Sequence, residues 1–264
     1  MGVIEAIKKG FGIASKMLLL IAVLFVFNAV WNIGSLPFSR PAGGAAPAFS
    51  PAAFVFSVIF ILASIFVQGG TLGLVRDNIK AGTLKLADFL GYGLKYYLKL
   101  LALGALIALL VIVVALLATL MIALTAPLNN IAITVLAVLV AIIIGGFGLY
   151  LVVLLMMAPY ALVCDEAKVI DAMKKSITFV RKNVVKVLGL LVLLILISFG
   201  ISFVIVLLAG LVTMALPAAV GQIIIGLISS AVNSYLGIVM IGSLMSFFLA
   251  LTASVKPAEP QPAS

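Results

Sequence analysis

Histidine is absent from this 264-residue sequence, and Cys164 is the single cysteine. Histidine is the commonest general base near neutral pH and a frequent metal ligand, so its absence removes the usual parts of acid–base and metal sites. One cysteine cannot form an internal disulfide. We therefore expect no catalytic residue, no metal and no cofactor, and a protein that is not an enzyme.

Charged residues are also scarce, at 9% of the chain, whereas 66% of the chain is hydrophobic. Soluble domains are about one quarter charged, so this chain has too few polar side chains to cover a surface in water. In a bilayer only helices and closed barrels satisfy their own backbone groups. Barrel strands alternate in polarity over about 10 residues, and the long apolar runs here do not alternate. The sequence predicts an all-α membrane protein built as a six-transmembrane-helix bundle.

Six apolar runs are long enough to cross a membrane, which takes about 20 residues each. We expect spans at about 17–36, 52–75, 100–124, 131–163, 187–211 and 219–251. They form a single predicted membrane domain, 1–254, followed by a disordered cytoplasmic tail, 255–264. A cleaved signal peptide is the alternative for the first span, because small residues follow it at 41–48.

The basic residues predict how the spans are oriented. Of the 16 lysines and arginines, only Arg40 falls on the opposite side of the predicted spans from the others. By the positive-inside rule, both termini are cytoplasmic and the chain is a multi-pass protein of the cell membrane. The net charge of +9 indicates anionic lipid headgroups rather than nucleic acid as the partner, because the charges lie beside apolar runs.

Three segments mix basic with apolar residues, at 1–16, 83–99 and 165–186. VIEAIKK at 3–9 is similar to VIDAMKK at 169–175, which indicates a possible threefold hairpin repeat. We expect amphipathic interfacial helices on the cytoplasmic side, with passive anchoring of the spans as the alternative to binding. The cations predicted to contact lipid headgroups or a protein partner are Lys8, Lys9, Lys95, Lys99, Lys174, Lys175, Arg181, Lys182 and Lys186.

Small and polar residues within the spans predict close packing between helices. Besides lipid, a protein partner or a homo-oligomer is the expected partner. The predicted helix-packing seam consists of Gly69, Gly73, Gly145, Gly146, Gly226, Ser230, Asn233 and Ser234. The alternative is that span amides line a polar path, namely Asn28, Asn32, Gln68, Gln222 and Asn233. A hinge at the glycines of the fourth span is a further alternative to packing.

The stretch 158–190 resembles a known membrane domain. It reads APYALV, an acidic pair, VIDAMKKS, an aromatic residue, a basic pair and a return to an apolar run. This order is similar to the multi-pass domain in front of some glycerophosphodiester phosphodiesterases and to related stand-alone prokaryotic membrane proteins of unknown function. The resemblance implies six helices and no known catalytic residues, because catalysis in fused members belongs to a separate soluble barrel. The matching residues are Ala158, Pro159, Tyr160, Ala161, Val163, Asp165, Ala172, Lys174, Ser176, Phe179 and Lys186.

Three functions remain open from the sequence. The leading hypothesis is a non-enzymatic membrane protein that acts as a lipid-contacting scaffold or as the membrane subunit for a partner. The second is a permease or channel for a lipid-like or weakly polar small solute, which predicts a polar cavity near the midplane beside Asn233. The third is an intramembrane enzyme, which requires an acid such as Asp165 or Asp171 in a pocket.

Overall fold

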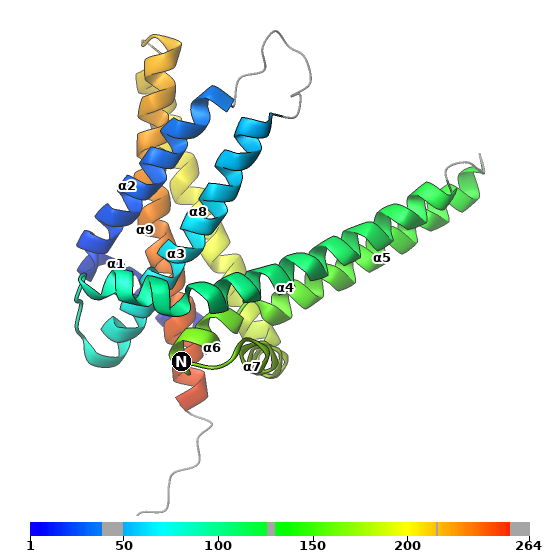
Figure 1. Cartoon of the computed structure of the whole chain (residues 1–264), viewed down its shortest axis with the longest axis horizontal. Helices are drawn as coiled ribbons and strands as arrows, with labels where there is room; N and C mark the ends of the chain where they lie inside the picture. The colour runs from blue at the N-terminus through cyan, green and yellow to red at the C-terminus, as the bar shows by residue number, and fades with distance from the viewer. Residues whose placement is uncertain (39–49, 126–129, 215, 254–264) are drawn as a thin grey trace, which may run out of the picture. The chain divides into compact units, whose positions relative to one another are not determined.

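The computed structural model describes residues 1–38, 50–125, 130–214 and 216–253, and every regular element within these ranges is a helix (Figure 1). The prediction of an all-α chain is confirmed. Arg40 and the predicted tail lie outside the described residues. The helices are α1 (Val3–Lys16), α2 (Leu18–Ser35), the 3-10 helix η1 (Leu36–Phe38), α3 (Pro51–Ala81), α4 (Asp88–Thr125), α5 (Ile131–Leu155), α6 (Ala158–Cys164), α7 (Val169–Lys182), α8 (Val184–Thr213) and α9 (Ala218–Ala253).

Six helical stretches are long and apolar enough to cross a membrane, as predicted. Many of their large apolar side chains are exposed, which in water would leave most of the surface hydrophobic and in lipid carries no such penalty. The chain is therefore a multi-pass membrane protein. The six stretches are Leu18–Ser35, Pro51–Ala81, Asp88–Thr125, Ile131–Cys164, Val184–Thr213 and Val220–Ala253.

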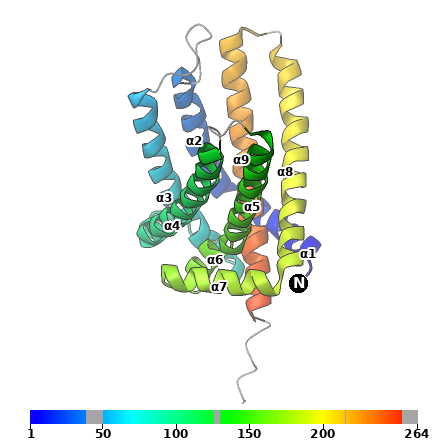
Figure 2. The same ribbon diagram turned by 90° about the vertical axis from the view of Figure 1, so that its right-hand side faces the viewer.

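The chain divides into two compact units, of which the first comprises Met1–Tyr97 and Val185–Ser264. Helix α9 is the centre of this unit, because α1, α2 and α3 all pack against it. In both views α2 runs alongside α9 (Figures 1 and 2). More than half of the most apolar stretch of α9 is buried, which is true of no other candidate span.

Small residues explain how α1 reaches α9 so closely. A side chain at Gly10 of α1 would overlap Ser243 and the backbone oxygen of Val239. Gly242 of α9 in turn faces Gly10 and Ile13. The apolar face of α1 is thereby buried, and its lysines remain exposed.

The second unit, Leu98–Val184, contains most of α4 together with α5, α6 and α7. Helices α4 and α5 form a long hairpin (Figure 1), in which Gly148 of α5 lies against Val114 of α4. Helix α7 packs against α5 and α6 and crosses below α6 in Figure 2. The amphipathic α7 thus closes the end of this hairpin unit.

The predicted interfacial segment 83–99 differs from the structure. It does not form a separate surface helix, because from Asp88 onward it is the first part of α4, which continues into the span without a break. The residues that join the two parts include no proline, and a change from polar to apolar side chains does not by itself end a helix. Lys95 and Lys99 therefore lie on the first turns of a candidate spanning helix.

The central glycines of α5 do not interrupt it. The helix continues through Gly145 and Gly146, both of which are exposed with open space beside them. The break in this span lies later, at Met156 and Met157, between α5 and α6. Gly145 and Gly146 therefore do not break the helix, and a hinge there stays a prediction.

Candidate functional site

The break between α5 and α6 positions the most basic helix of the chain. Pro159 stands in the first turn of α6, and a proline removes one hydrogen bond of the preceding turn because it has no N–H. Ser176 of α7 is fully buried beside this break and supplies hydrogen bonds to the backbone there. Its Oγ accepts a hydrogen bond from the backbone N–H of Met157 at 3.1 Å and donates one to the backbone oxygen of Leu154 at 2.6 Å.

Helix α7 separates apolar from basic side chains. Ala172, Ser176, Phe179 and Val180 are buried on one face. The cations of the other face are exposed, and two of them occupy the last turn, where positive charge stabilises the helix dipole. The exposed cations of the α7 surface, as we call it, are Lys168, Lys174, Lys175, Arg181 and Lys182. Lys186 is exposed on the first turn of α8, in the other unit.

One α7 cation is paired. Lys175 Nζ lies 2.8 Å from Asp165 Oδ2 across the turn between α6 and α7. Both side chains are partly exposed, so the pair contributes little to stability. Glu166 in the same turn has a φ of 50°, which turns the chain sharply between the two helices. Asp165 and Asp171 are both exposed rather than enclosed in a pocket.

Helix α1 repeats the arrangement of α7. Lys8, Lys9 and Lys16 are exposed opposite its buried face. Lys9 Nζ lies 3.9 Å from Glu5 Oε1, a long contact on the helix surface. The sequence similarity of 3–9 to 169–175 therefore corresponds to two separate amphipathic helices, one in each unit.

A buried arginine cluster joins α3 to the start of α4, and the sequence analysis did not identify it. Arg76 is only 9% exposed. Its Nε and Nη2 each lie 2.9 Å from Asp77 Oδ1, and its Nη1 donates to Tyr96 Oη at 2.6 Å. Tyr92 Oη donates to Asp77 Oδ2. Arg76 also lies within 6 Å of both tyrosine rings, so one carboxylate and two tyrosines surround most of the charge.

Glycines of α3 make room for the tyrosines of this cluster. A side chain at Gly73 would overlap Tyr92, and one at Gly70 would overlap Phe89. Gly69 is buried on the same helix. The signal that could have revealed the cluster is the GGTLG run just before Arg76, facing aromatic residues at helical spacing.

Polar residues of the predicted seam pair α2 with α9. Asn28 Nδ2 donates to Ser234 Oγ at 2.9 Å, and Asn32 Nδ2 donates to Ser230 Oγ at 2.7 Å. Gly226 lies beside Asn32. The structure thus brings three residues of the predicted seam together, with partners on α2 that the sequence analysis had considered as path-lining amides.

The other predicted seam residues lie elsewhere. Gly73 belongs to the α3–α4 contact, Gly69 is buried on the same helix, and Gly145 and Gly146 face outward from α5. Asn233 is exposed and lies in a hollow between α8 and α9.

The described residues include no group of three or more His, Cys, Asp or Glu side chains that could hold a metal ion. The thiol of Cys164, the single cysteine of the sequence, is buried.

One known protein family matches this sequence. A family described as "Domain of unknown function (DUF7847)" matches residues 1–251. No curated protein and no solved structure matches the chain. The resemblance to the membrane domain of glycerophosphodiester phosphodiesterases is not tested by this match and stays a prediction. Because the match covers nearly the whole chain, this multi-pass membrane protein belongs to the DUF7847 family.

Proposed function

We propose that this protein is a non-enzymatic membrane scaffold whose amphipathic helices α1 and α7 lie on the cytoplasmic surface and bind anionic lipid headgroups. The proposal places both termini in the cytoplasm and the chain in the cell membrane. A protein partner or a second copy of the chain would bind at the same two helices.

The observation that carries the proposal is the exposed charge of α7. Its cations point away from a buried apolar face that is fixed to the end of a candidate span. Each basic residue near an anionic membrane surface contributes about 1 kcal/mol. Three α7 cations form no ion pair among the described residues, namely Lys174, Arg181 and Lys182. Together they favour anionic over zwitterionic lipid by about 3 kcal/mol at most.

Lipid selectivity of the full-length protein in reconstituted bilayers tests the proposal. Electron spin resonance of spin-labelled lipids gives the relative association of phosphatidylglycerol and phosphatidylcholine with the protein. We expect a preference for phosphatidylglycerol that weakens at high salt, because salt screens exposed charges. The triple variant Lys174→Gln, Arg181→Gln and Lys182→Gln should lose at least half of this preference.

The matched control exchanges the same cations without removing charge. Lys174→Arg, Arg181→Lys and Lys182→Arg should retain the preference, since headgroup attraction follows charge. Lys175 is left unchanged in both variants because it pairs with Asp165. An unchanged preference in the glutamine variant would refute headgroup binding by α7.

A permease for a lipid-like or weakly polar solute is the second candidate. The observation that favours it is the hollow of about 450 Å³ between α8 and α9, where Asn233 is accompanied by Ser198 and Ser202. The remaining lining residues are apolar or glycine, so the hollow suits an apolar solute better than a hydrophilic one. Transport of a fluorescent lipid analogue between the leaflets of proteoliposomes, absent from protein-free vesicles, tests this candidate.

A further inference from the structure

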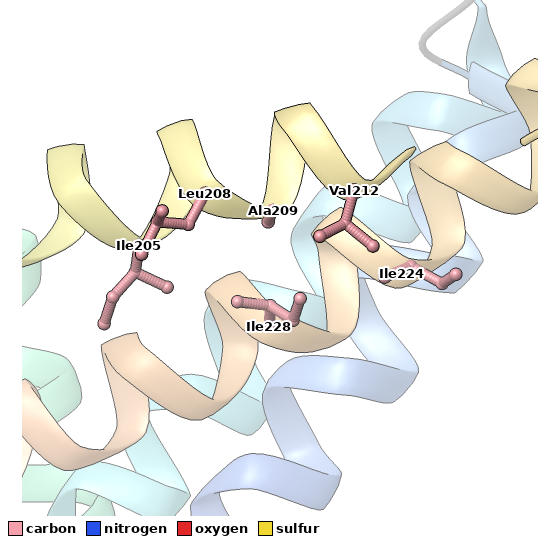
Figure 3. Close-up of a pocket in the computed structure, with 6 residues that line it drawn as sticks. All are labelled: Ile205, Leu208, Ala209, Val212, Ile224 and Ile228. Carbon is pink, nitrogen blue, oxygen red and sulfur yellow. The ribbon is translucent and has the colours of Figure 1, made fainter. Parts of the chain in front are cut away.

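Helices α8 and α9 leave two consecutive hollows between them. They meet closely near their connecting turn, where Gly221 lies beside Thr213. Beyond that contact, a hollow of about 260 Å³ is lined only by apolar side chains, Ile205, Leu208, Ala209, Val212, Ile224 and Ile228. Figure 3 shows these side chains between the two helix ribbons.

The second hollow follows directly along the same two helices and contains polar groups. It is lined by Ser198 and Ser202 of α8 and by Asn233 of α9, among apolar neighbours such as Phe199 and Met240. None of the three polar side chains has a hydrogen-bond partner among the described residues. They differ in this from Asn28 and Asn32, whose amides are paired with serines of α9.

The depth of these groups makes their lack of partners costly. Ser198 and Asn233 lie about four helical turns, or about 22 Å, from the ends of α8 and α9 at their connecting turn. The hydrocarbon core is about 30 Å thick, so both side chains lie within it when the helices cross the membrane. Water is scarce there, and polar groups in lipid are expected to bind one another or a ligand.

We propose that the α8–α9 groove, made of these two hollows, binds an uncharged lipid that carries hydroxyl or ester oxygens. The oxygens bond to Asn233, Ser198 and Ser202, while a hydrocarbon chain lies along the apolar hollow.

Two observations select this class of ligand. No charged residue lines either hollow, so a phosphate or ammonium group has no counter-ion there, and headgroups of that kind stay at the membrane surface. The hollows have the volume of a small-ligand site, whereas a partner helix, about 10 Å across, would cover them rather than fill them. A diacylglycerol has both the oxygens and the chain.

Photolabelling of the full-length protein in phosphatidylcholine nanodiscs tests the proposal. The probe is a diacylglycerol with a diazirine in one acyl chain, and the labelled residues are mapped by mass spectrometry. We expect labels on the groove faces of α8 and α9, near Ile205 and Ile228, that unlabelled diacylglycerol displaces. Asn233→Leu should lower this labelling at least about threefold, the effect of one hydrogen bond in a membrane.

Controls separate binding from passive filling and from misfolding. Tyr150→Phe removes an exposed hydroxyl from α5 of the other unit and should leave labelling unchanged. Ser198→Ala combined with Ser202→Ala should lower labelling as Asn233→Leu does, with unchanged thermal unfolding in both.

Three outcomes would overturn the proposal. Equal labelling of the groove by a diazirine phosphatidylcholine would mean that bulk lipid fills it. Equal labelling of Asn233→Leu and the unmodified protein would remove the role of the polar groups. Crosslinking of two copies through Asn233→Cys, in a Cys164→Ala background, would assign the groove to a second copy. Because the assay uses no anionic lipid, its failure is independent of headgroup binding by α7.

Discussion

Ser176→Ala tests how the broken span and the basic helix are held together. Ser176 of α7 bonds the backbone on both sides of the break, at Met157 and Leu154. Alanine removes the hydroxyl alone and leaves helix propensity intact or improved. Any loss of stability therefore comes from the two hydrogen bonds and not from the helix itself.

The size of the loss follows from burial. Ser176 is fully buried, as is Met157, so water cannot easily replace the hydroxyl. A buried polar group left without its partner costs about 1–3 kcal/mol, and two groups are affected. We expect a total of about 2–4 kcal/mol, which corresponds to a fall in melting temperature of about 4–16 °C for a chain of this length.

Thermal unfolding of the purified protein in detergent measures this effect, and trypsin sensitivity at Lys174 reports whether α7 has come loose. Thr178→Ala is the matched control, because Thr178 lies on the same helix but is exposed and bonds only the backbone of Lys174 within the helix. Its effect should stay within about 0.5 kcal/mol. If Ser176→Ala unfolds at the same temperature as Thr178→Ala, the bridging role assigned to Ser176 is wrong.

Three further predictions use the same unfolding assay. Gly10→Ala should destabilise by about 1–3 kcal/mol through overlap with α9, whereas Gly12→Ala, with open space beside it, should stabilise slightly; equal effects would contradict the α1–α9 contact. Arg76→Lys should cost about 2 kcal/mol, because lysine keeps the charge but cannot reach both the carboxylate and the tyrosine hydroxyl; a neutral result would mean the cluster is dispensable. A double-mutant cycle of Asn32→Leu and Ser230→Ala should give a coupling of about 0.6–2 kcal/mol, and additive effects would show that the bond contributes nothing.

Charged and amide groups in this protein follow one pattern. Where they lie within or beside the spans and are buried, they are matched to partners on another helix, as Arg76 is to Tyr96 and Asn28 is to Ser234. Unmatched polar groups in hydrocarbon are costly, so such pairs set which helices lie side by side. Asn233 of the α8–α9 groove is exposed and has no partner on another helix among the described residues, and its place in a hollow beside Ser198 and Ser202 is the reason it points to a ligand.

Composition and the length of the apolar runs determined the class of this protein and the position of its candidate spans. A helix in lipid satisfies its own backbone, so a run of about 20 apolar residues predicts a spanning helix without knowledge of its neighbours. Helical periodicity likewise identified the amphipathic helices α1 and α7 within the predicted segments 1–16 and 165–186, because the spacing of apolar residues along one face is a local property of the chain. Pro159 indicated in principle that the helix is interrupted near it. Nothing in the sequence indicated that Ser176 bonds the backbone at that interruption.

The tertiary structure alone decided which polar groups meet. Asn28 and Ser234 are separated by most of the chain, and the spacing of residues within one helix says nothing about the register of another. The same holds for Arg76 with Tyr96, and for Asn233, which shares a sequence pattern with Ser230 and Ser234 but faces α8 in place of α2. In a chain this uniformly apolar, hydrophobicity cannot choose between helix faces, so close packing at small residues and a few hydrogen bonds make that choice.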